Sequence, residues 1–292
     1  MRTVHTPVML REVVEYLDPQ PGKRFVDATL GAAGHTLALL EKGADVVGID
    51  RDAEIIAIAA KRLADAGLAA HFTPIHSSFA DALEPANKKL TGEFDGILFD
   101  LGVSSFQLDT AERGFSFMKD APLDMRMDRS LAVTAADLIN GLGKKELAEL
   151  FDLLGEERFA KKIAVAIAER RKVKPLQSTV ELAQLVESVV PRTGRLHPAT
   201  KVFQALRMAV NSERSELKAA LPSALSWLAS GGVLAIISFH SLEDKIIKDF
   251  MREAETAGTL GIDPATPVSP TAEEVNSNPR ARSAKLRIGR KI

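Results

Sequence analysis

The chain has 292 residues, of which 46% are hydrophobic and 26% charged, so it is long enough to bury a sizeable core. Its formal net charge of −1 gives no overall attraction to nucleic acid, and the absence of cysteine excludes disulfide bonds, thiolate metal sites and a cysteine nucleophile. The six histidines lack metal-ligand spacing and no apolar run approaches the roughly 18 residues of a membrane-spanning helix, so we expect a cytoplasmic protein without a metal site or membrane contact.

The first hundred residues alternate strand and helix patterns. Short apolar runs at 25–28, 44–50 and 95–100 are typical of buried strands, and 71–75 is a further candidate. Residues 53–66 carry apolar side chains at helical spacing between two of these strands. Such alternation predicts an α/β fold with a mostly parallel sheet and right-handed crossovers.

The pattern changes after residue 100. Residues 101–130 have no clear period, which indicates a long functional loop, and the chain then reads as helical to residue 190. A strand pattern returns only at 231–238. We therefore expect a discontinuous domain formed by 1–107 and 200–292, with 108–199 inserted as a loop and helical substrate-recognition domain. Small, polar and proline residues at 254–277 are typical of a mobile connection.

Three predicted strands end in an acid, namely Asp27, Asp50 and Asp100. Ligands of open α/β sheets bind at the carboxyl ends of the strands, so these side chains mark a candidate site. Gly31 and Gly34 follow the first strand and allow a ligand to approach the backbone closely. Asp50 lies where an acid accepts hydrogen bonds from ribose hydroxyls, which predicts a nucleoside site.

The glycine pattern leaves the nucleoside open. The loop reads D-x-x-x-G-x-x-G from Asp27, whereas dinucleotides with a pyrophosphate favour G-x-G-x-x-G at a helix N-terminus. S-adenosylmethionine (SAM) has no phosphate and tolerates a looser loop. A tight strand-to-helix turn without a ligand would explain an isolated glycine pair equally well.

Longer blocks are more specific than the glycine loop. They are DGILFDLGVSS (95–105), ERGFSF (112–117), DAPLDMRMD (120–128), GEERFA (155–160), HPAT (197–200), SFHSLED (238–244) and NPRARS (278–283). In this order and over nearly the whole chain, the blocks resemble the ribosomal RNA small subunit methyltransferase H family, also called MraW. The resemblance implies a class I SAM-dependent methyltransferase fold, Rossmann-like with a mostly parallel sheet and an inserted all-helical domain.

The resemblance also implies a reaction and a set of site residues. SAM would donate a methyl group to N4 of a cytidine in the decoding region of 16S rRNA, with free rRNA or the small ribosomal subunit as partner. The SAM contacts of the family fall here on Ala33, Gly34, His35, Asp50, Phe79, Asp100 and Gln107. The family usually has Gly at position 33, and amino-methyltransferases in general often have Asn/Asp-Pro-Pro-aromatic where this chain has Asp-Leu-Gly-Val.

Two residues are candidates for the chemistry itself. The cytosine amine is a poor nucleophile, so an acceptor that takes its proton would help, and Asp100 or a backbone carbonyl just after it is placed for that task. Asp100 acting only as a SAM ligand explains the pattern equally well. We expect His240 to line the substrate pocket, although a structural histidine fits too. A Ser238–His240–Asp244 hydrolase lacks the G-x-S-x-G elbow.

Basic residues and aromatic residues suggest where RNA would bind. Positive charges gather between 158 and 174, between 192 and 201, and after 279. Such clusters are usually solvated faces, but these lie in the insertion and the tail, where they can contact phosphates. Phe106, Phe115 and Phe117 are candidates to stack on an unstacked base or to pack in the core.

Other functions remain open from the sequence. They are a methyltransferase acting on DNA or a small amine, a nucleotide-dependent oxidoreductase and a non-catalytic RNA-binding module. The sequence indicates neither a monomer nor a homodimer.

Overall fold

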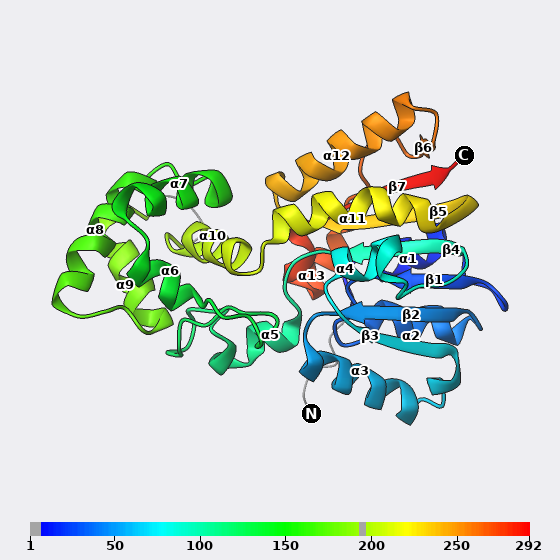
Figure 1. The fold of residues 1–292 in the computed structure, drawn as a ribbon, viewed down its shortest axis with the longest axis horizontal. Helices are drawn as coiled ribbons and strands as arrows, with labels where there is room; N and C mark the ends of the chain where they lie inside the picture. Colours follow the sequence, from blue (N-terminus) through cyan, green and yellow to red (C-terminus); the bar gives the residue numbers. More distant parts are fainter. Residues whose placement is uncertain (1–6, 193–196) are drawn as a thin grey trace. The chain divides into compact units, whose positions relative to one another are not determined.

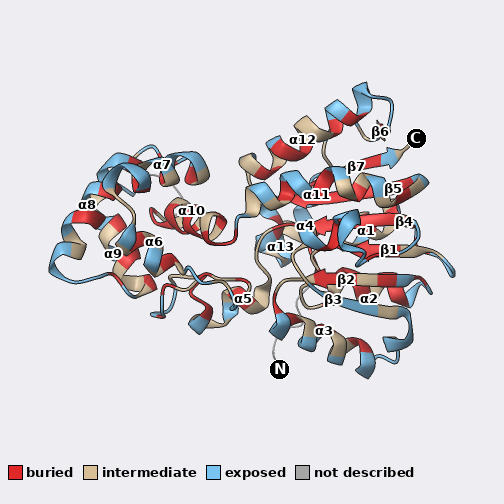
Figure 2. Cartoon of the chain, in the orientation of Figure 1, coloured by how far each residue is buried: buried red, intermediate tan, exposed pale blue. Residues whose placement is uncertain are grey.

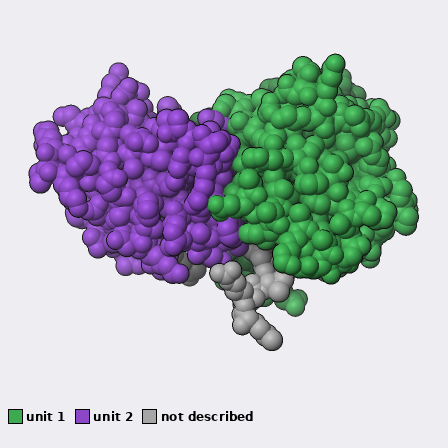
Figure 3. Space-filling model, turned by 60° about the horizontal axis from the view of Figure 1, so that its bottom comes forward, with its two compact units in different colours: residues 1–102, 214–292 green, residues 103–213 purple. Residues whose placement is uncertain are grey.

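The computed structural model describes residues 7–192 and 197–292, which fold into two compact units. The first, here called the sheet unit, comprises 1–102 and 214–292, and the second, the helical unit, comprises 103–213 (Figure 3). No helix in the described ranges is both long and apolar enough to cross a membrane. Each unit has a hydrophobic core of its own, so each is described by itself.

The sheet unit is built around a seven-stranded sheet with the strand order β3-β2-β1-β4-β5-β7-β6 (Figure 1). The strands are β1 Arg24–Asp27, β2 Asp45–Asp50, β3 Phe72–His76, β4 Phe94–Asp100, β5 Leu228–Ser238, β6 Leu260–Ile262 and β7 Lys285–Lys291. Neighbours from β3 to β5 are parallel, and β7 is antiparallel to both β5 and β6. The strand order reverses between β1 and β4, which is where such sheets bind ligands.

Helices cover both faces of this sheet (Figure 1). They are α1 Leu10–Leu17, α2 Gly34–Glu41, α3 Ala53–Asp65, α4 Phe79–Leu83, α11 Glu213–Trp227, α12 Ser241–Thr256 and α13 Ala272–Ser277. Successive side chains of β5 point to opposite faces, so Val233 and Ala235 join the core beneath α1 and α2, while Leu234 joins the core beneath α11 and α12. Figure 2 shows the inner strands as the most continuously buried part of the unit.

The predicted α/β class and its parallel sheet are confirmed, but the tail differs from expectation. Residues 254–277 contain the end of α12, β6 and α13 rather than an unstructured connection. The basic tail forms β7, whose Leu286 and Ile288 are buried. Arg287 and Lys285 both contact Asp244, so these two cations of the tail stabilise the sheet edge, and RNA binding by the tail stays a prediction.

The helical unit contains α5 Ser105–Asp109, α6 Ala135–Gly141, α7 Lys144–Gly155, α8 Ala160–Val173, α9 Thr179–Val189 and α10 Thr200–Val210. One apolar cluster joins α6 to α10. The unit runs from 103 to 213, whereas the sequence suggested an insertion of 108–199. The difference arises because Val202, Phe203 and Leu206 of α10 pack into the helical core rather than against the sheet.

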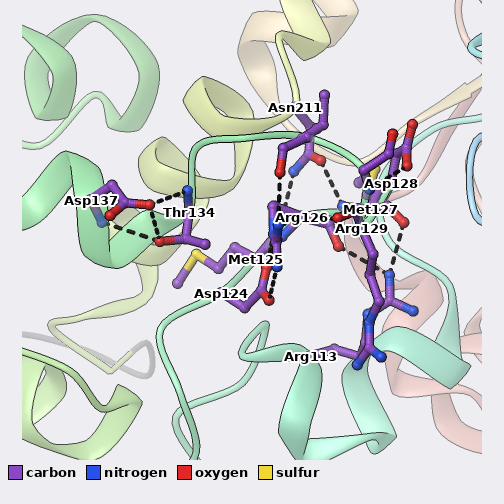
Figure 4. Close-up of polar contacts among 12 residues, drawn as sticks. Arg113, Asp124, Met125, Arg126, Met127, Asp128, Arg129, Thr134, Asp137 and Asn211 are labelled. Carbon is purple, nitrogen blue, oxygen red and sulfur yellow. Dashed lines mark hydrogen bonds and ion pairs between the residues drawn. The ribbon is translucent and has the colours of Figure 1, made fainter.

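Between α5 and α6 the expected long loop is held by side chains (Figure 4). Arg113 is 1% exposed and donates from Nη2 to the carbonyl oxygens of Arg126 at 3.0 Å and Met127 at 2.8 Å. The side chain of Asn211 accepts from the Met127 amide and donates to the Met125 carbonyl, both at 2.8 Å. These bonds give a segment without regular structure one defined backbone path.

Candidate active site at the carboxyl edge of the sheet

The carboxyl ends of β1, β2, β4 and β5 meet at one edge of the sheet unit. Asp27, Asp50 and Asp100 are the last residues of the first three strands, and Ser238 ends the fourth. Asp100 pairs in register with Ile237, and the Leu101 amide donates to the Ile237 carbonyl at 3.0 Å. The parallel register therefore places Asp100 and Ser238 on neighbouring strand ends. The strand patterns of the sequence predict this shared edge for Asp27, Asp50 and Asp100.

Asp27 has a structural role at this edge. Its carboxylate accepts from the Thr36 hydroxyl at 2.7 Å and from the Thr29 amide at 3.2 Å, and the residue is only 1% exposed. Burial raises the pKa of Asp27 to about 6, against the lowering effect of the Thr36 and Thr29 hydrogen bonds. Asp27 thus ties β1 to the first turn of α2 and is not presented to a ligand.

Asp50 shapes the glycine loop. Its Oδ2 accepts from the Gly31 amide at 3.0 Å and its Oδ1 from the Asp52 amide at 2.9 Å. Burial raises the pKa of Asp50 to about 6, while the two amides oppose the rise. Each carboxylate oxygen has a second acceptor position, so Asp50 retains the capacity to bind two hydroxyl groups.

The glycine loop has one position where the sequence departs from the family pattern. Ala33 is fully buried and precedes α2 with φ 58°, a left-handed conformation that costs a residue with a Cβ about 1–2 kcal/mol. This conformation favours glycine, the residue that the family resemblance leads us to expect there. A Cβ on the next residue, Gly34, would collide with the Pro7 side chain, so the segment before α1 requires the glycine.

His35 and Asp100 face each other across the switch point. His35 is 5% exposed, with Nε2 3.0 Å from the Val8 carbonyl oxygen and Nδ1 3.7 Å from Asp100 Oδ2. A carbonyl only accepts, so Nε2 carries a proton. Burial, followed by the negative charges of Asp27 and Glu243, raises the pKa of Asp100 to about 8.

Two buried oxygens at this edge have no hydrogen-bond partner within the described residues. They are Asp100 Oδ1 and Ser238 Oγ, on neighbouring strands. Buried polar atoms are nearly always hydrogen-bonded in folded proteins, and an exception indicates a functional position or a bound partner such as a ligand or water. A further acid at this edge is Glu243, a buried residue in the first turn of α12 that the sequence analysis did not single out; it accepts from the Phe239 amide at 3.0 Å.

His240 connects this edge to a cavity. Its Nδ1 accepts from the Glu243 amide at 3.3 Å and caps α12, while its Nε2 lies 3.0 Å from Glu243 Oε1. The cavity has a volume of about 420 Å³ and is lined by Phe239, His240 and Ser241 on one side and by Arg282 and Lys285 on the other. His240 therefore lines a pocket and caps α12, while its place in a substrate pocket stays a prediction.

This geometry disfavours the serine hydrolase alternative. The imidazole of His240 contacts Glu243, and the carboxylate of Asp244 is bound by Arg287 at 2.7 Å and Lys285 at 3.0 Å. A catalytic triad requires the acid to orient the histidine and the histidine to reach the serine hydroxyl. Ser238 Oγ has no such partner in the described chain.

The two remaining predicted SAM contacts are Phe79, which follows β3 at the same edge of the sheet, and Gln107. Phe79 begins α4 after β3, with its ring edge-on to Phe99 at 5.5 Å and the Arg51 guanidinium 5.8 Å from its centroid. Gln107 belongs to the helical unit, where its side chain completes the capping box of α5 by accepting from the Ser104 amide at 3.1 Å. Their contacts with a cofactor stay predictions.

The predicted RNA-binding side chains divide into engaged and exposed groups. Arg171 donates to the Ile139 carbonyl and Arg170 to the Lys174 carbonyl, each at 2.7 Å, whereas Lys161 and Lys162 are exposed on α8. Phe115 is buried in the helical core. Arg170 and Arg171, which the charge pattern suggested as RNA contacts, thus also hold backbone carbonyl groups within the helical unit.

The comparisons with known proteins agree with one another. The model of the MraW methylase family matches residues 2–292. A Trichlorobacter lovleyi protein named ribosomal RNA small subunit methyltransferase H is 46% identical over 309 residues, covering 99% of this chain and 98% of that one. A protein of the same name from Nostoc punctiforme is 47% identical over 293 residues, covering 99% and 94%.

A solved structure supports the fold. The crystal structure described as a putative rRNA-methylase from Clostridium thermocellum has a TM-score of 0.50 and 13% identity, covering 99% of this chain and all of that one. At this identity the likeness concerns the fold alone. The family assignment rests on the sequence matches, which extend through both units.

Proposed function

Since the chain belongs to the MraW methylase family, we propose that it uses SAM to methylate N4 of a cytidine in the decoding region of 16S rRNA. Small-subunit rRNA is the substrate in the names of relatives that match nearly the whole chain at 46–47% identity. The cytidine and its N4 atom are what the resemblance of the motif blocks to this family implies. The alternatives are an amino-methyltransferase that acts on DNA or on a small amine.

The observation that carries the proposal is the pair of unsatisfied acceptors on neighbouring strand ends. Asp100 Oδ1 and Ser238 Oγ are buried without partners within the described residues, and His35 of the glycine-loop turn lies 3.7 Å from the Asp100 carboxylate. SAM brings a positively charged sulfonium, an ammonium group and ribose hydroxyls, which are the cation and donors that such acceptors need. The residues present therefore fit this cofactor, with Asp50 holding the ribose and the Ala33–His35 turn lying against it.

When bound, SAM supplies an electrophilic methyl group whose carbon–sulfur bond breaks as the carbon–nitrogen bond forms, leaving a neutral thioether. The chain must hold the nitrogen in line and remove one proton from it. The lone pair of a cytosine amine is delocalised, so a basic acceptor at the amine has a large effect. In the ligand-free chain burial raises the pKa of Asp100 to about 8, and a bound sulfonium would favour its ionised form, which can accept the proton.

The cavity next to His240 supports a base-binding pocket on the sheet unit. Its volume of about 420 Å³ is sufficient for one nucleoside, and Phe239 and His240 provide flat surfaces at its wall. The target base must leave its stack to reach the methyl donor. Arg282, which lines the same cavity, is placed to contact a phosphate of the flipped nucleotide.

Nucleoside mass analysis tests the proposal directly. Purified protein and SAM are incubated with free 16S rRNA, with small ribosomal subunits, with DNA and with cytidine, and each product is digested and analysed. We expect N4-methylcytidine from one or both rRNA substrates and none from DNA or cytidine. Methylation at another atom, or of DNA alone, would contradict the proposal. Titration with NADH distinguishes a methyltransferase from a nucleotide-dependent oxidoreductase, because only the oxidoreductase would bind NADH.

A further inference from the structure

The helical unit has a cavity of its own, which none of the site residues above touches. Its volume is about 490 Å³, and two motif blocks meet there. The turn between α7 and α8 contributes Glu157, Arg158 and Phe159, which belong to the GEERFA block. The segment at the start of α10 contributes His197 of the HPAT block and Lys201, the residue that follows this block. The two segments meet closely because α7 ends in a glycine.

That glycine shows that the approach is built into the fold. A Cβ on Gly155 would lie 2.7 Å from the carbonyl oxygen of Lys201, which is backbone and cannot move aside cheaply. The Lys201 ammonium in turn donates to the Glu156 carbonyl at 2.7 Å. One wall of the cavity is therefore a fixed junction of α7 and α10.

Positive charge dominates the polar side of this cavity. Arg158 is exposed and Lys201 is half-buried. The 11-residue helix α10 begins at the cavity after Ala199, whose amide donates to His197 Nδ1 at 3.1 Å. The acid in the wall, Glu157, is 5% exposed and accepts from the Phe159 amide at 2.8 Å. A helix N-terminus flanked by two cations favours a phosphate group.

Flat and apolar surfaces form the other side. The Phe159 ring packs against the helical core and carries the Arg158 guanidinium over it, 4.8 Å from its centroid, so the ring supports the guanidinium plane that faces a base. The His197 ring lies 4.6 Å from the Phe117 ring at a tilt of 33°, and Pro191 and Pro198 complete the wall. An inorganic anion would not need such walls, whereas a nucleotide presents both a flat base and a phosphate.

We infer that this cavity binds one nucleotide of the RNA substrate, outside the cytidine that is methylated. The inference rests on the proposed function, because it takes the substrate to be RNA. It assigns to the helical unit a contact that combines base stacking with phosphate binding. RNA affinity should therefore depend on the cavity, while SAM affinity and the rate of the methyl transfer step should not.

The charge arm of the test compares two reversals on neighbouring surfaces. Arg158→Glu places an acid in the cavity, and Lys161→Glu makes the same change on an exposed position of α8 that does not line it. We expect Arg158→Glu to weaken binding of a decoding-region RNA fragment by about tenfold in fluorescence anisotropy. We expect Lys161→Glu to weaken it by less than about threefold. Equal losses would overturn the inference, because they would indicate only general attraction.

The stacking arm uses a change that keeps the apolar volume. Phe159→Leu should weaken RNA binding by about fivefold or more without changing its salt dependence, because stacking involves no counterion release. In steady-state assays both cavity variants should raise KM for RNA and leave kcat and the calorimetric Kd for SAM unchanged. A fall in kcat with an unchanged KM would overturn the inference.

Two outcomes separate this inference from the proposed function. If the wild-type protein binds RNA in an Arg158-dependent manner but methylates no rRNA, the proposed function fails and the cavity assignment stands. If rRNA is methylated and both cavity variants match the wild type, the cavity assignment fails alone. Calorimetry with cytidine monophosphate and with inorganic phosphate completes the test: binding of either at micromolar concentration without any effect of the variants on RNA would point to a small effector and overturn it.

Discussion

Two polar clusters of this protein are built in opposite ways. In the helical unit, the loop cluster around Arg113, Asp124, Arg126 and Asn211 holds backbone and side chains in a closed set of hydrogen bonds (Figure 4). At the sheet edge, Asp100 Oδ1 and Ser238 Oγ are buried without partners. None of the loop cluster's atoms is among the unpartnered buried atoms of the described chain.

The difference separates stability from function. A satisfied buried network fixes one backbone path, and each of its members is expected to contribute to folding. An unsatisfied buried carboxylate costs free energy in the ligand-free protein and recovers it only when a ligand supplies the missing charge or donor. Changes in the two clusters should therefore have opposite signatures in stability and activity.

The largest expected effect is on turnover, from Asp100→Asn. The amide keeps the shape of the side chain but cannot take a proton, so kcat at saturating SAM should fall by about 10²–10⁴. The same change removes a desolvated charge and should not destabilise the ligand-free protein at pH 8. Asp249→Asn, an exposed acid on α12 paired with Lys245 at 3.1 Å, is the control and should match the wild type. Unchanged turnover of Asp100→Asn would leave this acid as a SAM ligand only.

The loop cluster should respond in the opposite way. Arg113→Ala leaves the carbonyl oxygens of Arg126 and Met127 without their donor and opens a cavity, so the free energy of unfolding should fall by about 3 kcal/mol. Urea unfolding followed by circular dichroism measures the change, and SAM binding by folded protein should persist. Lys119→Ala, at an exposed position of the same loop, should change stability by less than about 0.5 kcal/mol. A loss of SAM binding with intact stability would reverse the roles assigned to the two clusters.

Part of this contrast was visible in the sequence. The positions of Asp50 and Asp100 follow from strand patterns, because parallel strands bring their carboxyl ends to one edge. Asp27 satisfied the same rule, yet its carboxylate is taken by Thr36, a helix residue whose hydroxyl the pattern could not orient. Sequence spacing places a side chain at an edge but does not say which partner it finds there.

Charge patterns were less reliable guides than strand ends. The tail and the segment around Arg170 and Arg171 looked equally free to bind RNA, but Arg171 holds the Ile139 carbonyl and Arg287 holds Asp244. These partners are distant in the chain, so only the fold reveals them. Conversely, the apolar–polar alternation Leu286–Arg287–Ile288 is typical of a strand, and this part of the basic tail does form β7.

The pH dependence of stability sharpens the comparison. Asp100 has a pKa raised to about 8 in the folded chain from an ordinary 3.8, so the folded state keeps a proton that the unfolded state loses. Stability should therefore fall as pH rises from 4 to 8, and above pH 6 the slope belongs mainly to Asp100, because Asp27 and Asp50 have pKa values of about 6. The slope is at most about 1.4 kcal/mol per pH unit. Urea unfolding at pH 6, 7 and 8 measures it.

Saturating SAM and the asparagine variant provide the controls for that slope. A bound sulfonium favours the ionised carboxylate, so SAM should flatten the decline between pH 6 and 8. Asp100→Asn should flatten it without SAM. An unchanged slope in this variant would show that another group titrates, and the charge assigned to the sheet edge would be wrong.

The smallest effect concerns two adjacent residues of the glycine loop. Ala33→Gly relieves a left-handed alanine with φ 58° but frees the unfolded chain, so the two effects oppose each other and stability should change by less than about 1 kcal/mol. Gly34→Ala forces a Cβ into Pro7 and should weaken both folding and calorimetric SAM binding by more than the first change. The pair tests whether the loop is held by backbone conformation or by contact with the segment before α1. If Ala33→Gly altered SAM affinity more than Gly34→Ala, conformation at position 33 would control the site, and the alanine would tune the binding of the donor.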